Sequence, residues 1–350
     1  MSFVRAPHDL IVPRAEGLYC PQGDFYVDPW RPVARAVITH AHGDHARYGN
    51  AQYLCTRESE PFVRARLGDI TLQSVAYGEA LRIREASVSL HPAGHVRGSA
   101  QVRIEAGGEV WVVSGDYKLA ADPTCTPFEP VRCHVFVTES TFGLPIYRWQ
   151  SPQTVLGEID AWWQENAAAG RCSLLCCYAF GKAQRILAGL APGPGPLLVH
   201  GAVDTLARIY RENGIELPQT AHATSFTDRT LLARALVLAP PSAAGSTWPR
   251  RFGDHASAFA SGWMQVRGAR RQRGVERGFV LSDHADWPGL LQAVAATGAE
   301  RVLVTHGQAE SLARYLAEQG LRTAVLQTEY GNEDDADAGA ALHGDEAPSA

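Results

Sequence analysis

The sequence predicts an α/β protein, in which a strand-rich segment precedes a segment of alternating strands and helices. About the first 150 residues contain short β-branched and aromatic runs that close on Gly, Pro or Asp. After Pro152 a helical spacing appears, and strands then alternate with helices, which is typical of a parallel sheet with crossover helices. From Arg277 the chain returns to two strand–loop–helix units, each with a histidine near the end of its strand.

The individual elements follow from local patterns. In the first segment we expect strands at 23–29, 35–40, 51–56, 80–93, 99–116 and 134–140. The stretch 99–116 folds back at Gly107-Gly108 as a hairpin. A helix is expected at 154–170, where it ends on a glycine. Strand–helix units are expected at 173–190, 195–214, 278–298 and 299–320, with a strand at 234–241 and a loop at 191–196.

Size and composition restrict the class of protein. The chain has 350 residues and is 45% hydrophobic, which suits two domains or one large domain with an insertion. We find no signal peptide and no apolar run of about 18 residues, so we expect a cytoplasmic protein with no membrane partner. The seven cysteines are irregularly spaced and lack a zinc-ribbon pair, which favours reduced thiols in the core.

The net charge of −5 is concentrated at one end of the chain. The tail 331–350 holds six acidic residues and no Lys or Arg, which leaves the remainder of the chain near +1. This tail is rich in Ala, Gly, Asp and Glu without periodicity, so we expect it to be disordered.

A dense group of metal-binding residue types follows the apolar run at 36–38. The motif HAHGDH supplies His40, His42, Asp44 and His45. On a strand His40 and His42 would point the same way, and a turn at Gly43 would bring the other two to a neighbouring position. Imidazole and carboxylate suit zinc, with manganese or iron as poorer fits. A histidine-bearing surface turn is the alternative interpretation.

The motif THAHGDH resembles the hallmark of hydrolases with the metallo-β-lactamase fold. Further residues match this family's pattern in order. Asp28 closes the run FYVD and corresponds to an aspartate that orients a metal ligand. His95, in GHVRGS, matches the next metal histidine better than the nearby His91 does. Asp116, in VVSGD, matches the aspartate that bridges both metals, although alone it could be a turn residue.

Later motifs resemble the β-CASP branch of this family, which cuts nucleic acids. Glu139 lies in TESTFG, His284 in SDHAD and His306 in VTHG, while YAFGKAQ at 178–184 resembles the start of the β-CASP insert. Taken singly, Glu139 could be a turn or cap acid, and His284 could cap the helix after Pro288. The resemblance covers about 17–330. It implies an αββα metallo-β-lactamase domain at 1–150 plus 277–330, with an α/β β-CASP domain inserted at 151–276.

The resemblance also implies roles for these residues. His40, His42 and His95 would hold one metal. Asp44, His45 and His306 would hold a second, and Asp116 would bridge the two. The expected cofactors are two Zn²⁺ per chain, with Mn²⁺ as an alternative, and water held between them would attack phosphorus. His284 would protonate the leaving oxygen, and Glu139 would orient His284.

Several residues are candidates for contact with nucleic acid. Ser282 could donate to a phosphate or cap a helix, and Lys182 at a helix start could meet a phosphate or be an ordinary surface lysine. An arginine cluster, accompanied by Trp248 and Trp263, suits phosphate tracking and base stacking, although a solvated loop would look the same. The cluster consists of Arg250, Arg251, Arg267, Arg270, Arg271, Arg273 and Arg277.

The substrate is less clearly specified than the chemistry. At the position of His306 the crosslink-repair branch usually has Val. A histidine at this position resembles the RNA-processing branch instead. Longer strings such as FVLSDHADWPGLL resemble the bacterial ligase-associated DNA exonucleases. We therefore expect a DNA exonuclease that acts on single strands or ends in DNA repair, linked to an ATP-dependent DNA ligase and a helicase. The alternatives are a ribonuclease of RNA 3′-end or 5′-end maturation and an inactive subunit that binds nucleic acid.

Overall fold

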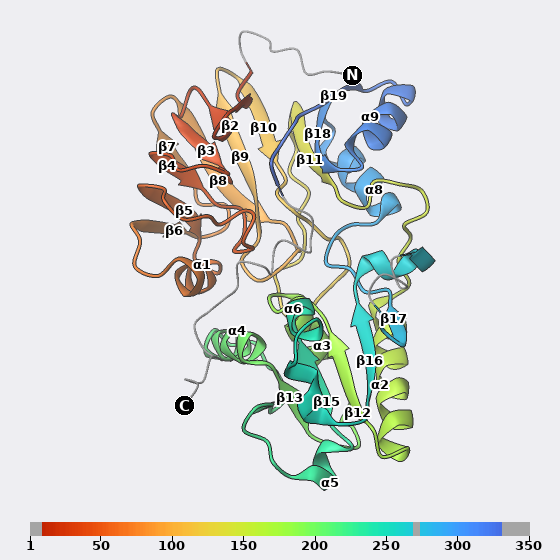
Figure 1. The fold of residues 1–350 in the computed structure, drawn as a ribbon. Helices are drawn as coiled ribbons and strands as arrows, with labels where there is room; N and C mark the ends of the chain where they lie inside the picture. Colours follow the sequence, from red (N-terminus) through yellow and green to blue (C-terminus); the bar gives the residue numbers. More distant parts are fainter. Residues whose placement is uncertain (1–8, 269–273, 331–350) are drawn as a thin grey trace. The chain divides into compact units, whose positions relative to one another are not determined.

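The computed structural model of the chain describes residues 9–268 and 274–330 (Figure 1). These residues form two compact units. The first contains the described residues up to Arg148 and those from His284 on, and the second runs from Trp149 to Asp283. The tail 331–350, for which we expected disorder, lies outside the described residues.

The first unit contains two mixed sheets. One has six strands in the order β1-β2-β3-β4-β5-β6, and the other has seven in the order β19-β18-β11-β10-β9-β8-β7. The strands of the six-stranded sheet are β1 (Val12–Arg14), β2 (Gly17–Cys20), β3 (Phe25–Val27), β4 (Arg35–Val37), β5 (Gln52–Thr56) and β6 (Leu72–Val75). Those of the seven-stranded sheet are β7 (Leu81–Ile83), β8 (Ala86–Pro92), β9 (Ala100–Ala106), β10 (Glu109–Val113), β11 (Val135–Ser140), β18 (Arg301–Gly307) and β19 (Arg322–Val325).

The residue pattern of these strands explains the layers. In β9, Val102 and Ile104 are fully buried, while Arg103 between them faces outward and pairs with Glu105. The hairpin expected at Gly107-Gly108 is confirmed, because β9 and β10 pair antiparallel across it. In the central strand β11 every residue is buried, as expected for a strand covered on both faces.

Two apolar cores lie on opposite faces of the seven-stranded sheet. Val135 and Val137 pack in a core shared with the six-stranded sheet, whereas Phe136 packs on the other face. Two helices cover that other face, α8 (Trp287–Thr297) and α9 (Ala309–Glu318) (Figure 1). A shorter helix, α1 (Glu60–Leu67), connects β5 to β6. The first unit therefore stacks two sheets with helices on an outer face.

The second unit is built on a parallel sheet, as the strand–helix alternation predicted. Its strand order is β14-β13-β15-β12-β16-β17, and all its pairings are parallel. The strands are β12 (Cys172–Cys176), β13 (Leu197–Val199), β14 (Ala221–His222), β15 (Leu236–Ala239), β16 (His255–Ala260) and β17 (Arg277–Phe279). The helices are α2 (Pro152–Ala168), α3 (Lys182–Gly189), α4 (Gly201–Glu212), α5 (Arg229–Leu232), α6 (Pro241–Ala244), η1 (Trp248–Phe252) and η2 (Gly262–Gln265).

Two details differ from the sequence-based expectation. Strand β17, which we had grouped with the first domain from residue 277 on, pairs with β16 in the sheet of the second unit. The change of unit falls between Asp283 and His284 instead. The seven cysteines are all described, buried and free, consistent with reduced core thiols.

Candidate metal centre

The HAHGDH motif forms a buried loop at the end of β4. That strand ends at Val37, so the expected strand alternation does not place His40 and His42. A tight turn does so instead, in which the amides of His45 and Ala46 donate to the carbonyl of His42 at 3.2 and 2.8 Å. All four motif side chains, from His40, His42, Asp44 and His45, are buried.

Two glycines allow the loops that carry site residues to approach each other. Gly115 has φ +56°, and a Cβ there would lie 2.7 Å from the Cβ of Thr39. This close approach brings Asp116 next to the loop that holds His40. Gly307 has φ +85°, and a Cβ there would collide with the carbonyl oxygen of Ser140. The glycines of SGD and THG therefore serve backbone packing at the site.

The side chains of His40, His42, His95 and Asp116 converge. One ligand atom from each lies within 4.8 Å of the others. His42 Nδ1 and His95 Nε2 are 3.1 Å apart, and His40 Nε2 lies 3.5 Å from Asp116 Oδ2. His91 is half-buried and bonds to Ser89 at 2.9 Å. The structure thus brings His95 into the cluster.

A second group of donors also meets Asp116, in part at the same carboxylate oxygen that His40 approaches. His45 Nε2 lies 3.4 Å from Asp116 Oδ2 and 3.5 Å from Asp44 Oδ2. His306 Nε2, from strand β18, lies 3.3 Å from Asp116 Oδ1. The six other residues expected as ligands therefore gather around the carboxylate of Asp116.

Unsatisfied atoms indicate what this cluster can hold. His40 Nε2, His45 Nε2, Asp44 Oδ1 and Asp116 Oδ1 are buried and make no hydrogen bond within the chain. Buried polar atoms without partners are costly, and native proteins rarely leave several of them together. Imidazole nitrogens and carboxylate oxygens are the donors that zinc prefers. The cluster can therefore hold a metal ion.

The charges of the cluster also favour a cation. Burial lowers the pKa of His45, but the carboxylates of Asp116, Asp44 and Asp28 outweigh it and hold that pKa well above its usual value. Burial, helped by His45, holds the pKa of His40 well below its usual value. Burial opposes ionisation of Asp116, yet His45 and His284 keep its pKa well below normal. A bound metal ion would balance the negative charge of these carboxylates, which otherwise favours a proton on His45.

Asp28 fixes the orientation of His45. Its Oδ2 lies 2.7 Å from His45 Nδ1, and it accepts hydrogen bonds from the amide and hydroxyl of Thr39 at 2.8 and 2.5 Å. Asp28 has φ +42°, an uncommon value for a residue other than glycine that is often found at functional sites. With Nδ1 engaged, the Nε2 atom of His45 points toward Asp116.

His284 and Glu139 form a buried pair beside the cluster. His284 Nδ1 lies 2.9 and 3.0 Å from the two oxygens of Glu139, and its ring centroid is 4.6 Å from that of His95. Glu139 also accepts from the amide of Tyr117 at 2.8 Å and the hydroxyl of Thr141 at 2.5 Å. Glu139 is close enough to Asp116 and His306 to share a metal with them. Its hydrogen bonds to His284, Tyr117 and Thr141 leave it better suited to orienting His284.

The structure does not show the helix-cap or turn roles that were the alternatives for Glu139, Ser282 and His284. Glu139 lies within strand β11 rather than at a turn. Helix α8 is capped by Asp286, whose side chain accepts from the amide of Gly289 at 2.9 Å. Neither Ser282 nor His284 is therefore that cap.

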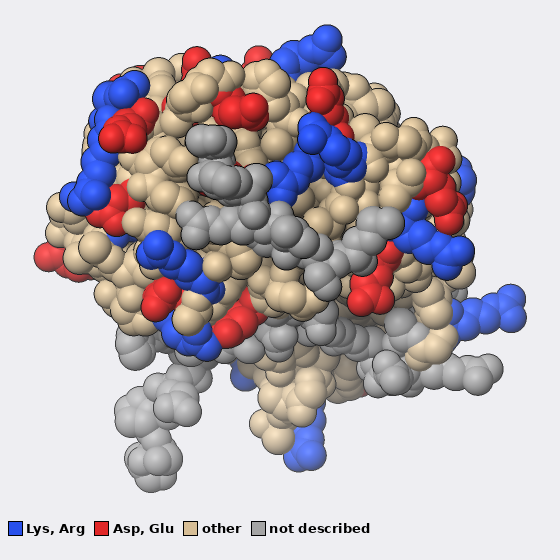
Figure 2. Space-filling model, turned by 90° about the horizontal axis from the view of Figure 1, so that it is seen from above, with Lys and Arg blue, Asp and Glu red and all other residues tan. Residues whose placement is uncertain are grey.

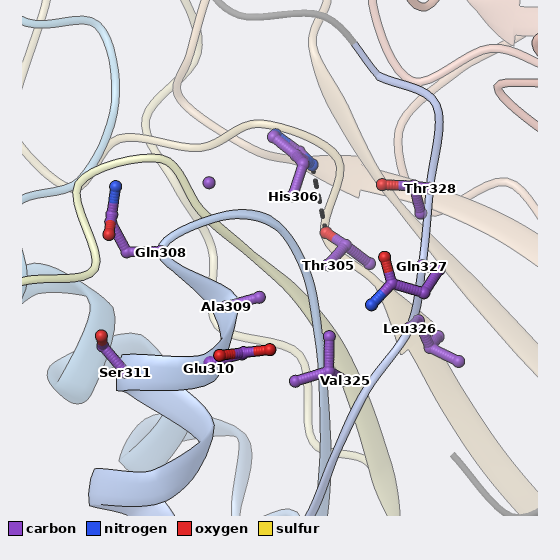
Figure 3. Close-up of a pocket in the computed structure, with 11 residues that line it drawn as sticks. Thr305, His306, Gln308, Ala309, Glu310, Ser311, Val325, Leu326, Gln327 and Thr328 are labelled. Atoms are coloured by element: carbon purple, nitrogen blue, oxygen red, sulfur yellow. Dashed lines mark hydrogen bonds between the residues drawn. The ribbon is translucent and has the colours of Figure 1, made fainter. Parts of the chain in front are cut away.

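A cavity of about 340 Å³ opens beside His306 (Figure 3). The first turn of α9 and the segment after β19 form its walls, and the ring of His306 borders it. His306 Nδ1 is engaged by Thr305 Oγ1 at 3.2 Å, as the dashed line shows. The other polar residues that line the cavity are Gln308, Glu310, Ser311, Gln327 and Thr328. His306 thus borders a space that can admit a polar ligand.

Lys182 and Ser282 lie in the second unit and are buried. The Lys182 side chain is 0% exposed, lies 3.5 Å from Asp283 and stacks over the ring of Tyr178. It is therefore not the surface lysine that we considered. Arg185 donates to the carbonyl of Ser282 at 2.6 Å and to Asp283 at 3.0 Å. Helix α3 thus anchors the two residues that precede His284.

The arginine cluster is only partly within the described residues. Arg270, Arg271 and Arg273 lie outside them. Arg250 and Arg251 are exposed on η1, where Arg251 packs over Trp248 at 5.1 Å, and Arg267 is also exposed. Arg277 lies 4.0 Å from Glu165.

Charges are mixed on the face that Figure 2 shows. Basic and acidic side chains of the described residues alternate there rather than form one broad basic area. Exposed pairs such as Arg103–Glu105 and Arg322–Glu300 are consistent with that pattern.

Sequence reasoning missed several residues that support the site. Thr39, Tyr117 and Thr141 each adjoin a predicted residue or follow it closely, and this adjacency was the available signal. Tyr117 also accepts from the amide of Ala285 at 2.7 Å, which ties the His284 segment to the loop after Asp116. Tyr330 stacks on His45, and nothing in its local sequence signals that contact.

Comparisons with known proteins point to nucleic-acid enzymes. No protein-family model matches the chain. A probable DNA ligase from Opitutus terrae is 32% identical over 315 residues, which cover 89% of this chain and 30% of that protein. The Endoribonuclease YSH1 of Yarrowia lipolytica is 29% identical over 120 residues, which cover 33% of this chain and 14% of that protein. The chain thus spans less than a third of the curated relatives it matches.

A solved structure supports the α/β fold. It is a protein of unknown function from Enterococcus faecalis V583, with a TM-score of 0.57 and 13% identity, covering 85% of this chain and 80% of the other. Within the described ranges, we find no helix with the length and apolar character needed to span a bilayer. The chain is a mixed α/β protein with a buried His/Asp cluster able to bind metal, related in sequence to proteins named as nucleic-acid enzymes.

Proposed function

We propose that this chain is a metal-dependent nuclease that hydrolyses DNA phosphodiester bonds, as an exonuclease on single strands or ends. The observation that carries the proposal is the arrangement around Asp116. Buried donors without hydrogen bonds surround this carboxylate, and the His284–Glu139 pair lies directly beside them. Such a constellation provides metal ligands and a proton donor for phosphodiester hydrolysis.

In this proposal each group of donors would hold one Zn²⁺, with Mn²⁺ as the alternative. His40, His42 and His95 form one set, Asp44, His45 and His306 form the other, and Asp116 is shared. Asp28 fixes the ring of His45 by its bond to Nδ1. Bound metal ions would supply Lewis acidity, lowering the pKa of water and neutralising charge on phosphate oxygens.

His284 and Glu139 supply proton transfer. With Nδ1 held by the Glu139 carboxylate, the Nε2 atom of His284 is the position that can carry a proton to the leaving oxygen. Glu139 fixes the tautomer and ring plane and stabilises the protonated form of His284. The cavity beside His306 provides space for a nucleotide next to the second set of donors.

We assign the first unit to a metallo-β-lactamase domain and the second to an inserted β-CASP domain. Two stacked sheets with helices on an outer face support the first assignment. A parallel sheet that interrupts the first unit in sequence supports the second. All the proposed ligands come from the first unit.

DNA is the proposed substrate because the similarity to the probable DNA ligase covers most of this chain. A functional link to an ATP-dependent DNA ligase and a helicase in DNA repair rests on the sequence resemblance alone. An RNA-processing ribonuclease is the second candidate. The match to an endoribonuclease and the presence of His306 favour it. An inactive binding subunit is a third candidate, which the complete set of donors disfavours.

Digestion of matched single-stranded DNA and RNA oligomers, labelled at either end, tests the proposal. DNA shortened progressively from one end, with RNA intact, is the expected result for the zinc-loaded chain. Asp116→Asn should abolish cleavage, and Asp69→Asn, at an exposed site in the same unit, should not. Preferred cleavage of RNA would favour the ribonuclease, and no cleavage of either by metal-loaded protein would favour the inactive subunit.

A further inference from the structure

Tyr330, at the end of the described chain, closes over the candidate metal centre. After β19 the amide of Leu326 donates to the carbonyl of Val304 at 2.9 Å. The chain then leaves the seven-stranded sheet and reaches the end of β3. There the hydroxyl of Tyr330 donates to the carbonyl of Val27 at 3.4 Å. This segment therefore joins the two sheets beside the histidine loop.

The ring of Tyr330 contacts one set of donors. It stacks on the imidazole of His45, with centroids 4.7 Å apart and planes 8° from parallel. It also meets His306 edge-on at 5.3 Å and Trp30 edge-on at 5.6 Å. Among the ring contacts of the described residues, none joins Tyr330 to His40, His42 or His95.

Polar contacts hold the segment in place. Arg47 Nη2 donates to the carbonyl of Glu329 at 3.2 Å, and Arg47 Nε donates to the carbonyl of Asp44 at 3.0 Å. One guanidinium therefore ties the segment to the backbone of a proposed ligand. Arg31 adds an ion pair with Glu329 at 2.8 Å, which is half exposed and contributes less.

We propose that Tyr330 is a positioning residue for the metal ion bound by Asp44, His45 and His306. The inference rests on the metal centre of the proposed function. Asp28 holds one edge of the His45 ring at Nδ1, but a single edge contact still allows the ring to tilt. The stacked face of Tyr330 prevents that tilt and keeps water from that side of His45, so Nε2 stays aimed at Asp116.

The expected effect is selective for one of two metal ions. Loss of an outer partner of a metal ligand typically lowers metal affinity by about 10- to 100-fold. Tyr330→Ala should therefore weaken one Zn²⁺ by about that factor and leave the other unchanged. Tyr330→Phe keeps the stack and loses only a long hydrogen bond, so it should bind both ions as the wild type does.

The test is a titration of the metal-free full-length chain with Zn²⁺ against a chromophoric chelator, repeated with Co²⁺ to record its absorption spectrum. The variants are Tyr330→Ala, Tyr330→Leu and Tyr330→Phe. Tyr315→Ala is the matched control, because Tyr315 is also half-buried in the first unit and meets Trp287 edge-on at 4.9 Å, away from the donors. Thermal unfolding shows which variants are folded, and Leu keeps apolar bulk if Ala does not fold.

A weakened second Zn²⁺ and an altered Co²⁺ spectrum in the Leu or Ala variant, with rescue by Phe, support the inference. If Tyr330→Leu bound each of the two ions as tightly as Tyr315→Ala does, the inference would be overturned. A wild-type chain that binds no metal would also overturn it. The nuclease assay is separate. Metal binding that depends on Tyr330 in a chain that cleaves no nucleic acid would retain this inference and refute the proposed function.

Discussion

Replacement of Glu139 by glutamine distinguishes an orienting role from a metal-binding role. The two carboxylate oxygens share His284 Nδ1, which lies 2.9 Å from Oε2, and differ in their other partners. Oε1 accepts from the amide of Tyr117 at 2.8 Å and lies 3.0 Å from His284 Nδ1. A glutamine with its carbonyl oxygen at that position retains both contacts. Its amide nitrogen then faces the hydroxyl of Thr141, which can rotate to accept, whereas the amide of Thr141 and His284 Nδ1 lose the acceptor that Oε2 provided.

The substitution therefore removes a negative charge while keeping the shape and most hydrogen bonds. The net cost in stability is about 1.5–3 kcal/mol, the range for losing a hydrogen bond to a charged group. Protonated His284 loses its counter-charge. Because general acid–base catalysis contributes about 10²- to 10⁴-fold, we expect kcat to fall by an amount in that range.

The assay combines single-turnover cleavage of end-labelled DNA with metal analysis of the same sample. We expect slow cleavage with two Zn²⁺ still bound. Thr126→Val, which removes a hydroxyl that contacts Glu58 in the same unit, is a control that should retain activity. A Glu139→Gln variant that loses metal would show that Glu139 is a ligand, and unchanged kcat would refute its role with His284.

Three further predictions follow from the described contacts. Asp28→Asn should lower the affinity of the chain for one Zn²⁺ by about 10- to 100-fold. Asparagine tolerates the positive φ of this position, but its amide nitrogen cannot replace a carboxylate oxygen in all the hydrogen bonds to Thr39 and His45. Calorimetric titration measures the affinity. Arg250→Gln with Arg251→Gln should weaken single-stranded DNA binding and reduce the salt slope by about 0.7 per lost contact; fluorescence anisotropy at several salt concentrations measures this. Burial raises the pKa of the Cys20 thiol to about 11, so little thiolate exists at pH 8. An alkylating reagent should therefore leave Cys20 unmodified in the native chain, which mass spectrometry can detect.

Each of these predictions has a control. Asp28→Asn compares with Asp69→Asn, whose affinity for both ions should equal that of the wild type. Arg314→Gln, at an exposed arginine paired with Glu318, should leave the salt slope unchanged. Alkylation in denaturant should label Cys20 fully, and rapid labelling in the native chain would show that the thiol is not buried as described.

The sequence predicted the sheets better than the turns. Alternation in β9 and the glycine pair after it predicted a hairpin that the structure confirms. Strand–helix alternation predicted the parallel sheet of the second unit. The grouping of strand β17 was not predicted, because its residues fit either sheet and only its pairing with β16 decides between them.

At the site, the residue types were recognisable but their arrangement was not. The alternation argument for His40 and His42 relied on a strand that ends at Val37. Their convergence depends on a turn and on the close approach at Gly115, which are long-range features. Tyr330 is distant in sequence from His45, so only the fold brings the two rings together.

The measurement that tests the central claim most directly is the rate of DNA cleavage as Zn²⁺ is added back to the metal-free chain. If the cluster around Asp116 is a two-metal hydrolytic centre, the rate should be near zero without metal and reach its maximum at about two equivalents. Cleavage that is equally fast in the metal-free chain, or metal saturation without any cleavage, would contradict the account.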